Sequence, residues 1–257
     1  VYQYSTIARD ITMRKEHENR LFELNKAKDR LFSVIAHDLR SPISSVKSAI
    51  ETIVNEFDDF SKDELFELIS SIKVSISNNC NLLDNLLQWS KMHIGDKPLH
   101  KANVNLRFAA DSAIAFLAST AAEKSITIEN NIPQDIGAFA DANVLQLLFR
   151  NLLSNAIKFS HAGGKIIVGA LAGEKAVEAW VQDFGVGIPE EKIADVLNIH
   201  EHYSSTGTAN ETGSGIGLSI CRELIQSHSD ATISCELIIS SKENEGTTVS
   251  FNLPKEI

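Results

Sequence analysis

The sequence predicts two architectures in succession, an antiparallel helical hairpin and then an α/β domain. Three observations predict this order. Between Thr12 and Met92 the chain has one proline, Pro42, and no glycine, whereas all 13 glycines follow from Gly95 onward. Apolar residues recur at steps of three and four in the first part, and strand-like and helix-like segments alternate in the second. With 43% hydrophobic and 23% charged residues, the 257-residue chain also has enough apolar material for a core.

The charge balance excludes several classes of partner. Lys and Arg total 24 against 34 Asp and Glu, which gives a formal net charge of −10. Such a chain is not attracted to nucleic acid or to anionic lipid, so we expect neither a nucleic-acid partner nor contact with a membrane. The longest apolar run, Ile166 to Gly173, is far shorter than the roughly 20 residues of a membrane-spanning helix.

Cysteine usage indicates a reducing, cytoplasmic setting. Cys80, Cys221 and Cys235 are odd in number and widely spaced, which is typical of free thiols and not of a disulfide framework or a zinc site. The chain begins at Val1 without a methionine. We therefore expect it to be part of a longer protein, whose membrane anchorage the sequence leaves open.

A break near Asn55 to Lys62 separates two helical stripes. Ser61 and Glu64 have the spacing of a capping box that opens the second helix. The apolar positions that share a helix face are Leu24, Leu31, Ile35, Leu39, Ile43, Val46, Ile50 and Ile53 before the break, and Leu65, Ile69, Ile72, Ile76, Cys80, Leu83 and Leu87 after it. A hairpin cannot bury two such stripes alone. We expect two copies to pair into a four-helix bundle; the alternative is packing against the second domain.

The region after Gly95 alternates between strand and helix patterns. The predicted strands are Ser125–Glu129, Ile166–Ala170, Val177–Gln182 and Thr247–Leu253, and the predicted helices are Leu106–Glu123, Asn143–Phe159 and Ile216–Ser227. This grouping predicts a sheet with helices over one face. The polar stretch from His200 to Ser214 is expected to be a mobile loop.

A glycine-rich segment, Gly213-Ser-Gly-Ile-Gly-Leu218, opens the last predicted helix. Glycines allow backbone N–H groups to approach an anion, and the amino end of a helix adds partial positive charge. The segment is not a Walker loop, because no Gly-Lys-Ser/Thr follows, and its spacing differs from the dinucleotide fingerprint. By itself it is equally well explained as a tight turn before a helix.

Two further motifs carry a carboxylate and two amides. Asp183-Phe-Gly-Val-Gly187 follows a predicted strand and can present its carboxylate to an amino group, or it is a simple turn. On the long helix before it, Asn151, Asn155 and Lys158 share one face. An amide oxygen suits Mg²⁺, which takes its other ligands from phosphates and water; the alternative is an ordinary amphipathic helix.

The fourth motif, Phe32-Ser-Val-Ile-Ala-His37-Asp-Leu-Arg-Ser41-Pro42, lies on the first predicted helix. A single helical histidine is more often structural than reactive, and its neighbour Asp38 contacts it only in a suitable rotamer. Pro42 removes a helical hydrogen bond and is expected to bend the helix just after His37. Such a bend would expose the imidazole to a domain that arrives from outside.

Together the four motifs resemble those of the transmitter module of two-component sensor histidine kinases. His37–Pro42 resembles the H box, Asn151–Phe159 the N box, Asp183–Gly187 the first glycine box and Gly213–Leu218 the second, in the order of the family. The likeness extends from about Thr12 to Pro254. It implies a helical hairpin that forms a dimeric four-helix bundle, followed by an α/β sandwich of the gyrase, heat-shock and histidine-kinase ATP-binding type.

The resemblance implies three segments. Residues 1–11 would be the terminal strand of an upstream PAS-like sensor domain, because Tyr4 to Lys15 resembles the end of such a domain and its exit helix. Residues 12–95 would form the dimerisation and histidine-phosphotransfer hairpin. Residues 96–257 would form the catalytic ATP-binding domain.

The resemblance also implies a role for each motif residue. His37 would accept the γ-phosphoryl group of ATP, Asp38 would orient the imidazole and take its proton, and Ser41 would position a water molecule. Asn155 would bind Mg²⁺, and Asp183 would accept a hydrogen bond from the adenine amino group. The other residues implied to bind ATP are Asn151, Lys158, Phe159, Gly185, Gly187, Gly213, Gly215, Ile216, Gly217 and Leu218. ATP and Mg²⁺ are therefore the expected cofactors.

The implied activity is that of an ATP-dependent protein-histidine kinase. It would phosphorylate His37 within a homodimer and pass the phosphoryl group to an aspartate on the receiver domain of a response regulator. The alternatives are an ATPase of the same nucleotide fold and an inactive dimerising scaffold. Such ATPases carry a glutamate base where this chain has Asn151, and a scaffold is expected to lack the motif residues that are present here.

One residue and two short segments depart from the family pattern. Ser41 stands where the family usually has Thr or Asn, the residue linked to dephosphorylation of the partner regulator. Leu197–His202 replaces a phenylalanine-rich box before the predicted lid at His200 to Ser214, and Ser229-Asp230 replaces a glycine pair. None of these changes removes a residue implied to bind ATP or to accept phosphate.

Overall fold

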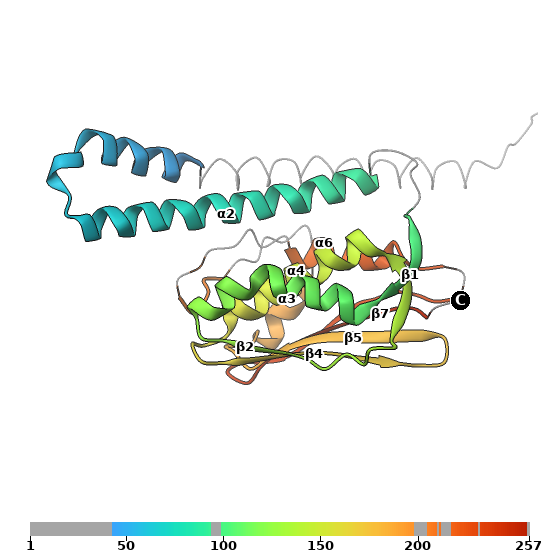
Figure 1. Ribbon diagram of the computed structural model, residues 1–257. Coiled ribbons are helices and arrows are strands. Elements are labelled where there is room, and N and C mark those ends of the chain that lie inside the picture. The colour runs from blue at the N-terminus through green and yellow to red at the C-terminus, as the bar shows by residue number, and fades with distance from the viewer. Residues whose placement is uncertain are drawn as a thin grey trace, which may run out of the picture. The chain divides into compact units, whose positions relative to one another are not determined.

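The structure of the protein is a computed structural model that describes residues 43–93, 99–197, 205–209, 211, 217–230 and 232–255. The chain divides into two units, Val1–Leu68 and Ile69–Ile257. Figure 1 labels several of the helices and most of the strands. Among the described helices, none is both long enough and apolar enough to cross a membrane.

Two helical segments flank the break that the sequence predicts. Residues 43–55 are α-helical, the short 3₁₀ helix η1 follows at Phe57–Asp59, and α2 spans Lys62–His93. The predicted break is therefore confirmed. At the break, the Glu56 N–H donates to Thr52 O at 3.0 Å, four positions back, and the Asp59 N–H donates to Glu56 O at 3.0 Å, three positions back as in a 3₁₀ turn.

The predicted capping box at the start of α2 is also confirmed. The Ser61 N–H donates to Glu64 Oε2 at 2.8 Å, and the Glu64 N–H donates to Ser61 Oγ at 3.3 Å. These reciprocal bonds satisfy donors that the first turn of a helix leaves without intrahelical partners. The Ser61 hydroxyl also donates to Glu64 Oε2 at 2.7 Å. This bond and the bond from the Ser61 N–H lower the pKa of the Glu64 carboxyl, because both favour its ionised form.

A five-stranded sheet forms one layer of the α/β region. Its strand order is β2-β4-β5-β7-β6; β2 and β4 are parallel, and all other neighbours are antiparallel. The strands are β2 (Thr127–Asn130), β4 (Lys165–Ala172), β5 (Ala176–Asp183), β6 (Leu237–Lys242) and β7 (Gly246–Pro254). A separate antiparallel pair consists of β1 (Lys101–Asn105) and β3 (Gly137–Asp141).

Three helices lie over one face of the sheet, α3 (Leu106–Glu123), α4 (Ala142–Phe159) and α6 (Gly217–Gln226) (Figure 1). The core lies between these helices and the sheet, where the Phe149 ring of α4 meets the Phe251 ring of β7 edge to face at 5.7 Å. The predicted fold class, a helical region followed by a sheet with helices over one face, is confirmed. The helix α4 is thus held firmly by its apolar side.

The structure also contains elements that the sequence does not predict. These are β1, β3 and β6, the short helix η2 (Glu190–Lys192) and the single turn α5 (Ile193–Val196). The strand β2 begins two residues later than predicted, because Ser125 has a φ of 55° and closes the turn after α3. The Ser125 N–H donates to Ala122 O at 2.9 Å.

The amino end of α4 is fixed by Asp141 and His228. Asp141 Oδ1 accepts hydrogen bonds from the N–H groups of Asn143 at 2.9 Å and Val144 at 3.4 Å, as a helix N-cap does. The Asp141 N–H in turn donates to Nε2 of the fully buried His228 at 3.1 Å. His228 Nδ1 lies 2.8 Å from Leu224 O, so the neutral imidazole donates from Nδ1 and accepts at Nε2.

Candidate functional site

The polar face of α4 is accessible, whereas its apolar face is not. Asn151, Asn155 and Lys158 are half-buried. The residues between them that are buried against the core are Leu152, Leu153, Ala156 and Ile157. Side chains three and four positions apart lie on one helix face. The two amides and the ammonium group therefore line a single surface, and the half-buried Phe159 ring ends it, with Lys158 Nζ at 4.6 Å from its centroid.

Asp183 is a buried carboxylate at the end of β5, with only 7% of its surface exposed. Its Oδ1 accepts hydrogen bonds from the N–H groups of Gly185 at 3.0 Å and Thr247 at 3.3 Å. Burial raises the pKa of this carboxyl to about 6, against the opposing effect of the two N–H donors. Because both donors engage Oδ1, the other carboxylate oxygen is the one suited to a donor on a ligand.

The loop after Asp183 packs against the carboxyl end of α4. The Val186 N–H donates to Phe159 O at 3.1 Å, and a Cβ atom at Gly185 would lie 2.1 Å from the same oxygen. Gly187 has a φ of +68°, and a Cβ there would lie 2.1 Å from Lys242 O. Chain packing alone therefore requires both glycines, and their closeness to a nucleotide stays a prediction.

The amino end of α6 lies beside the polar face of α4. Gly217 begins α6, and a Cβ atom at Gly217 would lie 3.5 Å from Asn151 Oδ1. Leu218 follows and is half-buried. The free N–H groups of a helix amino end attract anions, so this junction between α4 and α6 suits a phosphate.

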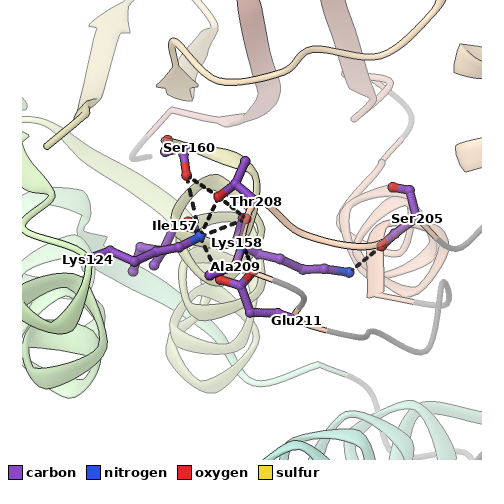
Figure 2. A network of polar contacts seen from close by, with 8 residues as sticks. All are labelled: Lys124, Ile157, Lys158, Ser160, Ser205, Thr208, Ala209 and Glu211. Carbon is purple, nitrogen blue, oxygen red and sulfur yellow. Dashed lines mark hydrogen bonds and ion pairs between the residues drawn. The ribbon is translucent and has the colours of Figure 1, made fainter. Parts of the chain in front are cut away.

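The Lys158 side chain reaches towards the described part of the predicted lid. Its Nζ donates to Ser205 O at 2.8 Å (Figure 2). Burial lowers the pKa of Lys158, and the nearby Lys124 lowers it further, whereas Glu211 raises it. The ammonium group is thus held by a neutral carbonyl and by one carboxylate in its neighbourhood.

A second lysine, Lys124, lies at the centre of a polar network that the sequence does not predict. Its Nζ contacts carbonyl oxygens at the end of α4, Thr208 Oγ1 at 2.8 Å and Glu211 Oε1 at 2.5 Å (Figure 2). No local pattern could reveal it, because Thr208 is 84 positions away along the chain. Thr247, the second donor to Asp183, was also missed, because it comes from a distant strand.

Several predicted site residues lie outside the residues that the structure describes. They are His37, Asp38, Ser41, Gly213, Gly215 and Ile216. The predicted PAS-like strand at residues 1–11 lies outside them as well. The described residues that the structure brings together are those of α4, the Asp183 loop and the start of α6.

Two family models match this chain. Residues 27–95 match the His Kinase A (phospho-acceptor) domain, and residues 140–257 match the Histidine kinase-, DNA gyrase B-, and HSP90-like ATPase. Together they cover more than half of the chain, in the order of a kinase transmitter. The chain is a histidine kinase transmitter module.

Several curated relatives of this transmitter module are named as sensory kinases. The adaptive-response sensory kinase SasA of Microcystis aeruginosa is 28% identical over 254 residues, which cover 96% of this chain and 64% of that protein. SasA of Gloeothece citriformis is 30% identical over 93% of this chain and 61% of its own length. The transmitter module thus spans less than two thirds of the length of these relatives.

Solved histidine kinase structures share its fold. The histidine kinase ThkA in complex with response regulator protein TrrA has a TM-score of 0.70 at 21% identity, over 97% of this chain and 68% of that one. The Acinetobacter baumannii histidine kinase AdeS has a TM-score of 0.64 at 17% identity, over 86% of this chain and 98% of that one. The likeness at these identities concerns the fold.

Among the described residues of the transmitter module, an amide oxygen of α4 is the kind of ligand that Mg²⁺ would use. Within the described residues, no group of three or more His, Cys, Asp or Glu side chains could hold a metal ion. Mg²⁺ commonly takes one or two protein ligands and completes its octahedron with phosphate oxygens and water. The half-buried Asn155, on the same face as Asn151 and Lys158, fits that use.

Proposed function

We propose that this transmitter module phosphorylates its own His37 with ATP and passes the phosphoryl group to an aspartate of a response regulator. One observation carries the proposal: His37 lies inside the phospho-acceptor match, and α4, Asp183 and α6 lie inside the ATPase match of the same chain. A nucleotide domain alone suits hydrolysis equally well. A phospho-acceptor domain adds the nucleophile that phosphoryl transfer needs.

Each described element would hold a different part of ATP. The Asp183 carboxylate would accept a hydrogen bond from the adenine amino group. Asn151 and Lys158, on the accessible face of α4, would hold the phosphates. The second glycine box would surround them with backbone N–H groups through Gly213, Gly215, Ile216, Gly217 and Leu218. Asn155 would hold Mg²⁺, which neutralises charge on the phosphates when bound.

The reaction needs positioning more than covalent chemistry from the nucleotide domain. A ring nitrogen of His37 would attack the γ-phosphorus in line, so that a P–N bond forms while the bond to the β–γ bridging oxygen breaks and ADP leaves. Asp38 would take the proton from the other ring nitrogen. The aspartate carboxylate of the receiver domain would then attack the same phosphorus, and the P–N bond would break.

The helical region is proposed to form a homodimer. The large apolar side chains that are exposed in it are Ile43, Ile50, Val54, Phe57, Phe66, Ile69, Ile76 and Leu83. Exposed apolar groups at helical spacing are buried when two hairpins join in a four-helix bundle. The match of residues 27–95 to a phospho-acceptor domain supports the same assembly.

The segment boundaries are likewise proposals. Residues 12–95 would form the dimerisation and phosphotransfer hairpin, and residues 96–257 the catalytic domain. The phospho-acceptor match ends at residue 95, which supports the boundary between them. A receiver-domain partner is supported by the similar structure of ThkA, which is in complex with a response regulator protein.

Nucleotide binding tests the proposed site. Wild-type chain, Asn155→Ala and Asp183→Asn would be titrated calorimetrically with Mg²⁺ and a non-hydrolysable ATP analogue, with Asn143→Ala at the exposed start of α4 as the matched control. We expect wild type and the control to bind alike, and both site variants to bind at least about tenfold more weakly, since each loses a contact to a charged or buried group. Equal binding by all four chains would contradict the assignment of the site.

A further inference from the structure

Lys124 caps the carboxyl end of α4 although it belongs to the end of α3. Its backbone N–H closes α3 by donating to Ala122 O, and its side chain is only 11% exposed. Its Nζ lies 2.9 Å from Ile157 O, 2.9 Å from Lys158 O and 3.4 Å from Ser160 O. These are carbonyls that a helix end leaves without intrahelical donors, and a cation there also interacts favourably with the helix dipole.

The same ammonium group holds residues 205–209 and Glu211, here named the anchored segment. Lys124 Nζ donates to Thr208 Oγ1 at 2.8 Å and pairs with Glu211 Oε1 at 2.5 Å. Thr208 Oγ1 in turn donates to Ser160 O at 2.6 Å, and Glu211 Oε2 accepts from the Ala209 N–H at 2.8 Å. Figure 2 shows these side chains converging on one point at the end of α4.

The anchored segment is hydrogen-bonded to Lys158 at both its backbone and its side chain. The Thr208 N–H donates to Lys158 O at 3.1 Å, while Lys158 Nζ donates to Ser205 O at 2.8 Å. Gly207 is buried between them, and a Cβ atom there would lie 2.8 Å from Lys158 O and 2.6 Å from Lys158 Cγ. The segment therefore lies so close to Lys158 that only glycine fits at position 207.

We propose that Lys124 is a positioning residue for nucleotide binding: it fastens the anchored segment to the end of α4 and thereby holds Lys158 in place for the phosphates. The proposal rests on the proposed function, in which Lys158 contacts ATP. The backbone of Lys158 is fixed by Lys124 and Thr208. Its ammonium group donates a hydrogen bond to the neutral carbonyl of Ser205 and lies over the Phe159 ring, with the Glu211 carboxylate in its neighbourhood. Phosphate oxygens are charged and are stronger acceptors than a carbonyl, so they would take the ammonium group from Ser205 without disturbing the backbone.

Glu211 contributes to the same arrangement. Burial lowers the pKa of Lys158, and Lys124 acts in the same direction. Glu211 opposes both effects, because its carboxylate favours the charged ammonium group. It therefore anchors the segment through Lys124 and also helps to keep Lys158 charged.

A double-mutant cycle on the full chain tests the proposal. Lys124→Met, Lys158→Met and the double variant would be titrated with Mg²⁺ and a non-hydrolysable ATP analogue, after circular dichroism has shown that each is folded. Gly207→Ala is the second route, because it displaces the segment sterically and removes no charge. Lys165→Met is the matched control, since it deletes an exposed pair with Glu129 at 2.9 Å in the same domain.

We expect Lys124→Met and Gly207→Ala each to weaken binding about tenfold, and the control to change it less than about twofold. If Lys124 acts through Lys158, the double variant binds no more weakly than Lys158→Met alone. A loss in fold stability by itself would instead make the two effects additive. The KM for ATP should rise by a similar factor, while the rate of phosphate incorporation at saturating ATP stays within about threefold of wild type.

Additive losses, or unchanged binding in Lys124→Met and Gly207→Ala, would overturn the proposal while wild-type binding still supports the proposed function. If wild type itself binds no nucleotide, both proposals fail together. If Lys124→Met does not fold, the cycle of Gly207→Ala with Lys158→Met decides the question by the same criterion.

Discussion

Burial makes Asp183 titrate far above an ordinary aspartate. Its carboxyl is nearly enclosed, and its two backbone donors, from Gly185 and Thr247, do not compensate for the lost hydration, so its pKa rises to about 6. An adenine amino group is a hydrogen-bond donor and requires an acceptor. The ionised carboxylate is the stronger acceptor, and it predominates only above that pKa.

Nucleotide affinity should therefore depend on pH through Asp183. Below about pH 6 the carboxyl is protonated, so we expect the Kd for an ATP analogue to rise several-fold as the pH falls from about 7.5 to about 5.5. Calorimetric titrations across this range would measure the effect. Asp183→Asn should bind weakly at every pH and lose most of the dependence. A wild-type Kd that does not change would contradict the assigned role.

The elements divide into those that local sequence determines and those that depend on distant pairing. The predicted bounds of α3, Leu106–Glu123, are the observed ones, because a long run of apolar periodicity is a local property. The strand β3 has the small, weakly alternating sequence GAFAD and exists because it pairs with β1. Tertiary pairing, not propensity, decides such short strands.

The candidate site shows the same division. The polar face of α4 and the end position of Asp183 follow from local pattern and are present in the structure. Lys124 could not be predicted, because a single lysine after an apolar helix has no local signature and its partners lie 33 to 87 positions away, from Ile157 to Glu211. Thr247 is 64 positions from Asp183, so no local pattern predicts their contact either.

At the amino end of α4, His228 should make stability depend on pH. Burial lowers its pKa from the usual 6.5, and the neutral ring accepts the Asp141 N–H. The unfolded chain then binds a proton more readily, so this contribution is complete above about pH 6.5 and is lost as the pH falls towards the folded-state pKa. We expect His228→Gln to lower the free energy of unfolding by about 1–3 kcal/mol near pH 7. On acidification, the free energy of unfolding of this variant should fall less than that of wild type.

Urea unfolding of wild type, His228→Gln and the control His161→Gln would measure these differences. His161 is exposed, so the free energy of unfolding of its variant should depend on pH as that of wild type does. Asp183 has a raised pKa and contributes a slope of opposite sign at the acidic end, but it is present in all three chains and cancels in the comparison. Parallel curves for wild type and His228→Gln would refute the role given to His228.

At the scale of the whole molecule, the proposed homodimer would bury the exposed apolar residues of the helical region. Ile69 is 57% exposed and lies on the predicted stripe of α2. Each apolar side chain of this size contributes about 2 kcal/mol when buried, and a symmetric dimer contains every contact twice. In the proposed dimer, a charge at position 69 would therefore be placed in the interface by both copies and would destabilise it twice.

We expect Ile69→Lys to weaken dimerisation by about 4 kcal/mol, roughly a thousandfold in Kd. Ser71→Lys makes the same change in charge at an exposed position on the opposite side of the helix and should leave the dimer intact. Sedimentation equilibrium across a concentration series would measure both. A wild-type chain that is monomeric at every concentration would refute the dimer and favour packing of the stripe against the second domain.

In the proposed function, His37 of this chain accepts the γ-phosphoryl group of ATP. The decisive experiment measures phosphate incorporation from γ-labelled ATP with Mg²⁺ in wild type, His37→Gln and the control His161→Gln. We expect wild type and the control to carry a protein label that survives alkali and is lost in acid, as phosphohistidine does. We expect no label in His37→Gln. A label that persists in His37→Gln, or free phosphate released with no labelled protein, would contradict the proposed function.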